Sequence, residues 1–110
     1  KGFPIVMNLA LPFLCEQQGN FNQRLLNTLM KIAGNIDDTN LIKRAGNATI
    51  SKDMQHWSMT FFQIGGSYTP EGLKFLNDLD QMFIKRNLSM GGAADNLILT
   101  IFLARLVGSL

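Results

Sequence analysis

Two short stretches of this 110-residue sequence carry residue types that suit phosphate and sugar chemistry. The first, DDTNLIKRAGN, places Asp37, Asn40 and Arg44 at spacings that share one face if the segment is helical. A carboxylate there can ligate Mg²⁺, and a guanidinium can hold phosphate oxygens with two hydrogen bonds. A solvated helix face, with Asp37 and Asp38 suited to the dipole at its beginning, explains the same pattern. Spacing alone favours this second interpretation.

The second stretch, NLSMGGAADNLILTIFLARL, sets a serine and two glycines before an acid and a long apolar run. Ser89 fits the N-cap of a helix whose first turn holds Gly91 and Gly92. Glycines let a ligand approach the backbone closely, and amides at a helix start favour anions. A glycine pair alone is weak evidence, because it also occurs in ordinary turns.

The acid of the second stretch, Asp95, sits in a segment that is apolar on nearly every side of a helix. It shares one face with Leu99, Phe102 and Leu106, and we expect that face to be buried. A buried carboxylate needs an arginine, a metal ion or several hydrogen-bond donors to stay ionised. A ligand site and a purely structural acid therefore explain Asp95 about equally well.

The elements that must position these residues are all helical, because apolar residues recur every three or four positions and no alternating strand pattern occurs. We predict an all-α fold of five to six helices, compact and orthogonal or bundle-like, around a central apolar C-terminal helix. Its caps are Asn20 or Asn22, Ser51, Thr69 and Ser89. The predicted helices cover residues 4–18 (kinked at Pro12), 20–33, 51–64, 69–87 and 89–107, with a kink, short helix or loop over 36–48.

Composition favours one helical domain over residues 1–110, and a first residue other than Met favours a piece of a longer chain. The net charge of +2 gives no support for nucleic-acid binding. The apolar C-terminal run is too short for a membrane span, and one cysteine excludes an internal disulfide, so we expect a cytoplasmic protein. Only 16% of residues are charged, which leaves room for an apolar surface against the remainder of its own chain or in a homo-oligomer.

Three segments together resemble the triphosphoribosyl-dephospho-CoA synthase family: KGFPIVMNLALP, LLNTLMKIAGNIDDTNLIKRAG and IKRNLSMGGAADNLILTIFL, in this order. The resemblance covers most of the chain, is weakest over residues 49–70, and corresponds to the C-terminal part of the family's chain. It implies a helical transferase that makes the prosthetic-group precursor of citrate lyase or malonate decarboxylase. In this reaction a ribose hydroxyl of 3'-dephospho-CoA displaces adenine from ATP, and the triphosphate is kept.

The resemblance also implies roles for the two stretches. The partners would be ATP and 3'-dephospho-CoA, with Mg²⁺ as the expected cofactor, and the fragment alone is expected to be inactive. The alternative is a helical interaction or oligomerisation module without catalysis. The predicted site comprises Asp38 and Asp95 as catalytic residues, Asn40, Arg44, Ser89, Gly91 and Gly92 as nucleotide- or phosphate-binding residues, and Asp37, Asp38 and Asp95 as Mg²⁺ ligands.

Overall fold

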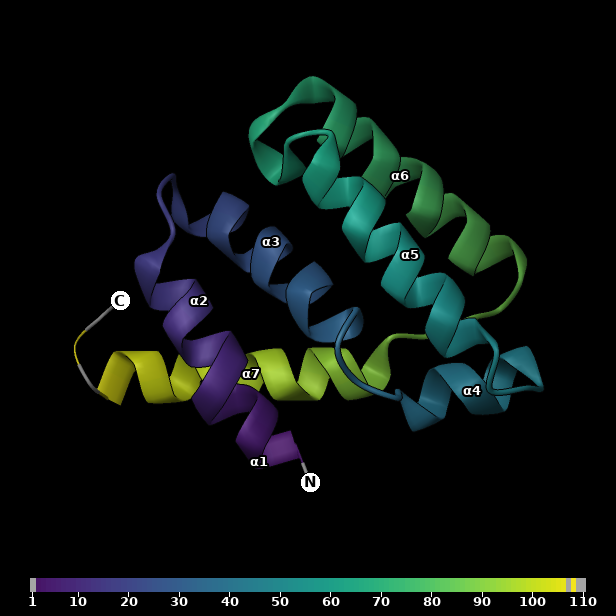
Figure 1. The fold of residues 1–110 in the computed structure, drawn as a ribbon, viewed down its shortest axis with the longest axis horizontal. Helices are drawn as coiled ribbons and strands as arrows, with labels where there is room; N and C mark the ends of the chain where they lie inside the picture. The colour runs from purple at the N-terminus through teal and green to yellow at the C-terminus, as the bar shows by residue number, and fades with distance from the viewer. Residues whose placement is uncertain (1, 107, 109–110) are drawn as a thin grey trace.

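The computed structural model describes residues 2–106 and 108 and is helical throughout, as predicted (Figure 1). Within these ranges it holds six helical segments and no strand. The first segment joins α1 (Gly2–Ile5), the π-helical turn η1 (Val6–Ala10) and α2 (Leu11–Glu16). The others are α3 (Phe21–Ala33), α4 (Thr39–Ala45), α5 (Ile50–Gln63), α6 (Pro70–Lys85) and α7 (Gly91–Leu106), with a 3₁₀ turn η2 (Gly66–Tyr68) before α6.

Proline and cap residues set most helix boundaries. Pro12 lies in the first turn of α2, directly after the π-helical turn, which widens the helix where the proline has no amide to donate. Asn20 caps α3 in a reciprocal pair with Gln23, and Thr69 caps α6, so both predicted caps are confirmed. The predicted cap at Ser51 is wrong.

Helix α5 begins before Ser51 because the preceding turn is already closed by another side chain. The carboxamide oxygen of Asn47 accepts a hydrogen bond from the Thr49 amide at 3.0 Å. The helix therefore begins at Ile50, and Ser51 falls inside its first turn. There the serine is buried, and its hydroxyl has no hydrogen-bond partner among the described residues. This isolated hydroxyl is a small local cost to stability.

Helix α7 runs across the base of the molecule and contacts α1, α2, α3 and α4 (Figure 1). The predicted central C-terminal helix is thus confirmed, but the predicted inner face is wrong. The buried face carries the small residues Ala93, Thr100 and Ala104, whereas Asp95 and Phe102 are exposed. Small side chains let neighbouring helix backbones approach closely, and an all-round apolar pattern gives no signal for which side does so.

The remaining helices form the body that holds α3 and α4 in place. Helices α5 and α6 lie side by side, and α5 packs on both α3 and α4 (Figure 1). Their shared core is apolar and includes Met30, Leu41, Ile50, Met54 and Phe61. Among the described residues, no helix combines the length and the hydropathy that a membrane crossing requires.

Candidate nucleotide site

The two stretches singled out in the sequence meet at one buried carboxylate. Asp38 is the N-cap of α4, and its Oδ1 accepts hydrogen bonds from the amides of Asn40 (3.0 Å) and Leu41 (3.3 Å). Its Oδ2 accepts a third from the amide of Ala93 in the first turn of α7 (3.0 Å). Asp38 is only 4% exposed. The carboxylate therefore caps two helices at once, where both dipoles favour negative charge.

This arrangement explains Gly92. A Cβ on Gly92 would lie 2.8 Å from Oδ1 of Asp38, which is buried and hydrogen-bonded and cannot easily move. A Cβ on Gly91 would lie 2.7 Å from Nδ2 of the Asn40 side chain, which is exposed and can turn aside. Gly92 thus lets α7 begin directly against the start of α4, which is a packing reason for this glycine.

Helix α4 is the short-helix alternative that the sequence left open over residues 36–48. Its first residue is Thr39, so Asp37 precedes the helix. The prediction that Asp37 shares a helical face with Asn40 and Arg44 is therefore wrong. Asp37 is instead exposed beside the N-cap, on the connection from α3.

A cavity of about 510 Å³ opens at the junction of α4 and α7. Both acids of the first stretch reach it, and Gly92 of the second stretch forms part of its wall. Asn96 follows one turn later and donates to the Gly92 carbonyl at 2.9 Å. The lining residues are Ile5, Asn35, Ile36, Asp37, Asp38, Thr39, Gly92 and Asn96.

The amides at the start of α7 are mostly engaged within the protein. The Gly91 amide donates to the Ser89 hydroxyl at 3.2 Å, the Ala93 amide to Asp38, and the Ala94 amide to the Met90 carbonyl. Met90 therefore holds the N-cap position, so the predicted cap at Ser89 is wrong and Ser89 lies one residue before the cap. The Gly92 amide takes part in none of the hydrogen bonds that the described residues form. It is the donor of this turn that remains for a ligand.

The predicted phosphate-binding side chains of α4 lie along the seam with the loop before α7, apart from the cavity lining. Arg44 donates to the side chain of Asn87 at 2.9 Å, and both are exposed. Asn87 adopts a left-handed conformation with φ of 54°, a conformation that asparagine tolerates better than most residues. Asn40 is exposed beside Gly91. This seam holds Asn40, Arg44 and Ser89 near α7 but outside the cavity wall.

The three predicted metal ligands are unlike in their surroundings. Asp37 is exposed at the cavity, Asp38 is buried, and Asp95 is exposed on α7 next to Asn96. Among the described residues, no three side chains of histidine, cysteine, aspartate or glutamate gather into a metal-binding group. A divalent cation here would therefore need oxygen ligands from a substrate, which is how Mg²⁺ commonly binds beside phosphates.

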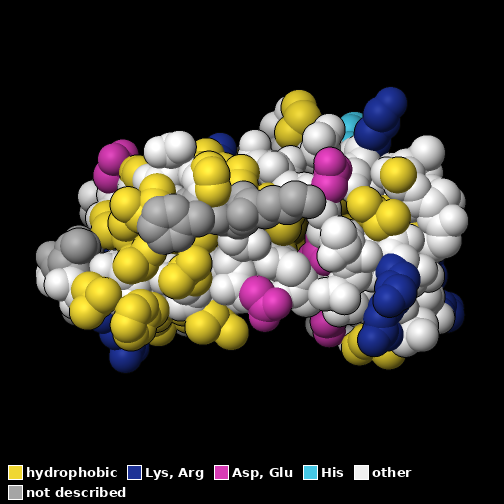
Figure 2. All heavy atoms as spheres, turned by 90° about the horizontal axis from the view of Figure 1, so that it is seen from below, with side chains coloured by type: hydrophobic (Ala, Val, Ile, Leu, Met, Phe, Trp, Pro, Cys, Tyr) yellow, Lys and Arg dark blue, Asp and Glu magenta, His cyan; other side chains and the backbone are white. Residues whose placement is uncertain are grey.

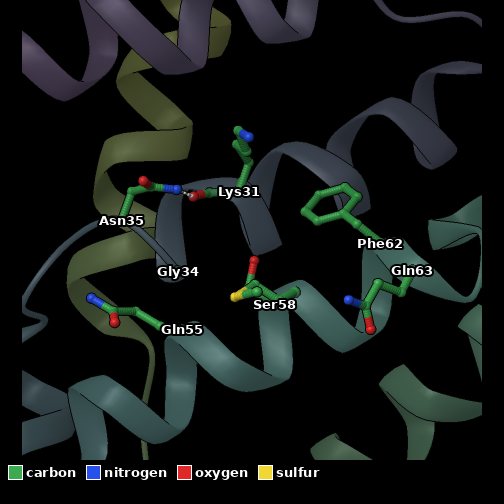
Figure 3. A pocket seen from close by; sticks show the side chains of 8 residues that line it. Lys31, Gly34, Asn35, Gln55, Ser58, Phe62 and Gln63 are labelled. Atoms are coloured by element: carbon green, nitrogen blue, oxygen red, sulfur yellow. Dashed lines mark hydrogen bonds between the residues drawn. The ribbon is translucent and has the colours of Figure 1, made fainter.

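A second cavity of about 520 Å³ lies between the end of α3 and α5 (Figure 3). Asn35 lines both cavities and donates to the Lys31 carbonyl at 2.7 Å. The opposite wall presents the amides of Gln55 and Gln63 with the ring of Phe62 between α3 and α5 (Figure 3). The two cavities therefore share one side chain and differ in character, the first acidic and the second rich in amides.

Comparison with known proteins decides the family. Residues 1–109 match CitG, ATP:dephospho-CoA triphosphoribosyl transferase. The chain belongs to this family. The family resemblance stated from the sequence is thereby confirmed over nearly the whole chain.

Two relatives show how the transferase segment occurs in longer proteins. Protein CitXG of Leuconostoc mesenteroides subsp. cremoris is 98% identical over all 110 residues, which make up 24% of that protein. The probable 2-(5''-triphosphoribosyl)-3'-dephosphocoenzyme-A synthase of Lactiplantibacillus plantarum is 46% identical over 102 residues, 93% of this chain and 36% of the relative. No solved structure matches the chain.

Some residues of the candidate site were not predicted. Asn35 and Thr39 line the cavity because they flank the two acids, Asn35 on the connection from α3 and Thr39 at the start of α4. Asn96 was visible as an amide inside an apolar helix, which is a signal for a polar site. Ile5 belongs to the first helical segment, and no local pattern connects it with residues 37 and 38.

Proposed function

We propose that this segment supplies part of the active site of a synthase that joins ATP to 3'-dephospho-CoA with release of adenine. The product is 2'-(5''-triphosphoribosyl)-3'-dephospho-CoA. The observation that carries the proposal is the Asp38 bridge, because it fixes Asp37 and the start of α7 at the wall of one cavity. Membership of the transferase family supplies the reaction class.

The reaction sets three demands on the site. A ribose hydroxyl oxygen of dephospho-CoA bonds to C1' of the ATP ribose, the C1'–N9 bond breaks, and adenine leaves with the bonding electron pair and takes up a proton. The attacking hydroxyl loses a proton to a base. Positive charge that develops at C1' is stabilised by a nearby carboxylate, as in glycoside hydrolysis. The triphosphate must be held throughout.

We assign the triphosphate to the cavity at the α4–α7 junction. Asp37 offers a free carboxylate there, and the Gly92 amide offers a donor at the positive end of α7. The Asp37 carboxylate would hold Mg²⁺, which would supply neutralisation of the phosphate charge.

Asp38 is better suited to positioning than to catalysis. Its two oxygens already accept three backbone hydrogen bonds, so a proton or a cation would compete with both helix caps. Asp95 is the stronger candidate for the catalytic carboxylate, since it is exposed one helical turn from Gly92. Arg44 retains guanidinium donors beyond the one bonded to Asn87, and these suit a second phosphate group.

The adjoining cavity gives a place for a second nucleotide. Its amides at Gln55 and Gln63 can exchange hydrogen bonds with a nucleobase edge, and Asn35 adjoins both cavities. A reaction that joins two nucleotides needs two such places side by side. A cytoplasmic location and a role in making the citrate lyase prosthetic group belong to the same proposal.

The reaction is tested by adenine release from ATP in an intact polypeptide that carries this segment. Release is expected only when dephospho-CoA is present, and Asp95→Ala is expected to lower it by about 100-fold or more, because an electrostatic group of this kind typically contributes that much. Undiminished release from Asp95→Ala contradicts the assignment of that residue. Absence of release from the wild type contradicts the reaction itself. The isolated segment is expected to release none.

A non-catalytic interaction module is the second candidate, and the exposed apolar side chains of α7 favour it. The two functions differ in nucleotide binding. If ATP with Mg²⁺ binds, it stabilises the intact polypeptide by about 2.7 kcal/mol at 100 times its Kd. An unchanged melting temperature over that range of ATP supports the interaction module instead. Sedimentation of the same sample tests the predicted homo-oligomer.

A further inference from the structure

One face of α7 carries large apolar side chains that nothing in the described structure covers. Ile98 and Leu106 are each 66% exposed and Phe102 is 58% exposed. Their spacing of four residues puts them in one row along the helix, which we call the α7 stripe. Seen from below, apolar side chains gather on the half of the molecule where α7 ends (Figure 2).

The α7 stripe differs from the scattered apolar residues of an ordinary surface. Single exposed apolar side chains are normal, but a contiguous row on one helix is typical of a buried interface. The row also has charged ends. Asp95 precedes Ile98 by three residues on the same face, and exposed Arg105 adjoins Leu106. A surface that covers the stripe would therefore be apolar, with a basic group toward Asp95 and an acidic group toward Arg105.

The lengths of the relatives indicate what covers it. The matched segment makes up 24% of one relative and 36% of the other, so most of each polypeptide lies outside it. Parts of one chain pack against one another through apolar faces, and each large side chain of the α7 stripe is at least 58% exposed.

We propose that the α7 stripe is the docking face for the remainder of the same synthase polypeptide. The covering surface runs along Ile98, Phe102 and Leu106 and ends against Asp95. Asp95 does not line the cavity but lies one turn from Gly92, which does, so the covering surface ends beside the cavity. Chain outside this segment is thus brought next to the site, and Asp95 is withdrawn from bulk water when the two parts meet.

Thiol accessibility in the intact polypeptide tests this proposal directly. Ile98→Cys is compared with Ile84→Cys, a matched isoleucine on α6 that is 68% exposed. Alkylation by iodoacetamide is followed peptide by peptide with mass spectrometry, and each rate is divided by the rate of the same thiol in urea. We expect the Ile98→Cys thiol to be protected at least about tenfold relative to the unfolded chain, because alkylation needs an exposed thiolate. Phe102→Cys is the second variant if Ile98→Cys misfolds.

Three results overturn the proposal. Protection below tenfold at Ile98→Cys and Phe102→Cys shows an open face. Protection that disappears on dilution shows that a second copy covers the stripe. Protection that requires added phosphatidylglycerol vesicles shows a lipid surface. The labelling result is independent of adenine release, so a failed transferase assay with a protected thiol contradicts only the proposed reaction.

Discussion

Replacing Gly92 by alanine tests the contact between the two site motifs. The added Cβ would lie 2.8 Å from Oδ1 and 3.0 Å from Cγ of Asp38, so the carboxylate or the start of α7 must move by several tenths of an ångström. Asp38 is buried and bonded on both oxygens, so any movement weakens its bonds to Ala93 or to α4. A hydrogen bond to a charged group contributes about 1.5–3 kcal/mol. Alanine regains about 1 kcal/mol of helix propensity.

The net expectation is a loss of about 0.5–2 kcal/mol from the local stability of the α4–α7 junction. Amide hydrogen exchange in the intact polypeptide measures it, as a fall of about 2- to 30-fold in the protection of peptides that cover the two helix starts. Gly91→Ala is the matched control in the same turn. Its Cβ would meet the end of the exposed Asn40 side chain, which can turn aside, so it is expected to be neutral or slightly stabilising.

A double-mutant cycle separates the contact from general strain. In an Asp38→Ala background the obstacle is gone, and Gly92→Ala is expected to cost little more. Equal protection in Gly92→Ala and Gly91→Ala would refute the reasoning. So would a Gly92→Ala penalty that persists unchanged without the Asp38 carboxylate.

Three further predictions concern the Asp38 bridge, the buried Ser51 hydroxyl and the expected metal ion. Asp38→Asn turns an amide donor toward the Ala93 amide or one of the α4 amides. We expect adenine release to fall and the free energy of unfolding to drop by about 2–4 kcal/mol. An unchanged melting temperature would contradict the bridge between the two helices. Ser51→Ala removes a buried hydroxyl without a partner, and we expect the free energy of unfolding to rise by about 1 kcal/mol; a urea titration that shows a loss contradicts this. EDTA is expected to stop adenine release and Mg²⁺ to restore it, whereas full activity in EDTA rules out the metal at the triphosphate.

The sequence was most informative where one local rule decides the structure. Asn20 and Thr69 set helix starts because a cap needs only its own next three residues. The acids and glycines of the site were recognised for the same reason, since both stretches are contiguous. The prediction of a cap at Ser51 was wrong because the side chain of Asn47, four residues earlier, accepts a hydrogen bond in the preceding turn.

The parts that could not be predicted depend on packing between distant segments. Nothing local shows that the Asp38 carboxylate reaches Ala93, 55 residues away, or that Asp38 explains the glycine at position 92. Packing against the other helices also decides which side of α7 is buried, because the helix is apolar all round and its small residues allow the closest packing. The prediction that Asp95 is buried failed on this point.

The central claim is that the cavity at the α4–α7 junction holds the triphosphate of ATP. Asp37→Asn tests it most directly, because Asp37 lines the cavity, is exposed, and makes no hydrogen bond through its side chain among the described residues. The matched control is Asp80→Asn, an exposed acid on α6 outside this cavity. In an intact polypeptide we expect Asp37→Asn to lower adenine release by about tenfold or more with an unchanged melting temperature, and Asp80→Asn to change neither. Equal release from Asp37→Asn, Asp80→Asn and the wild type would contradict the account.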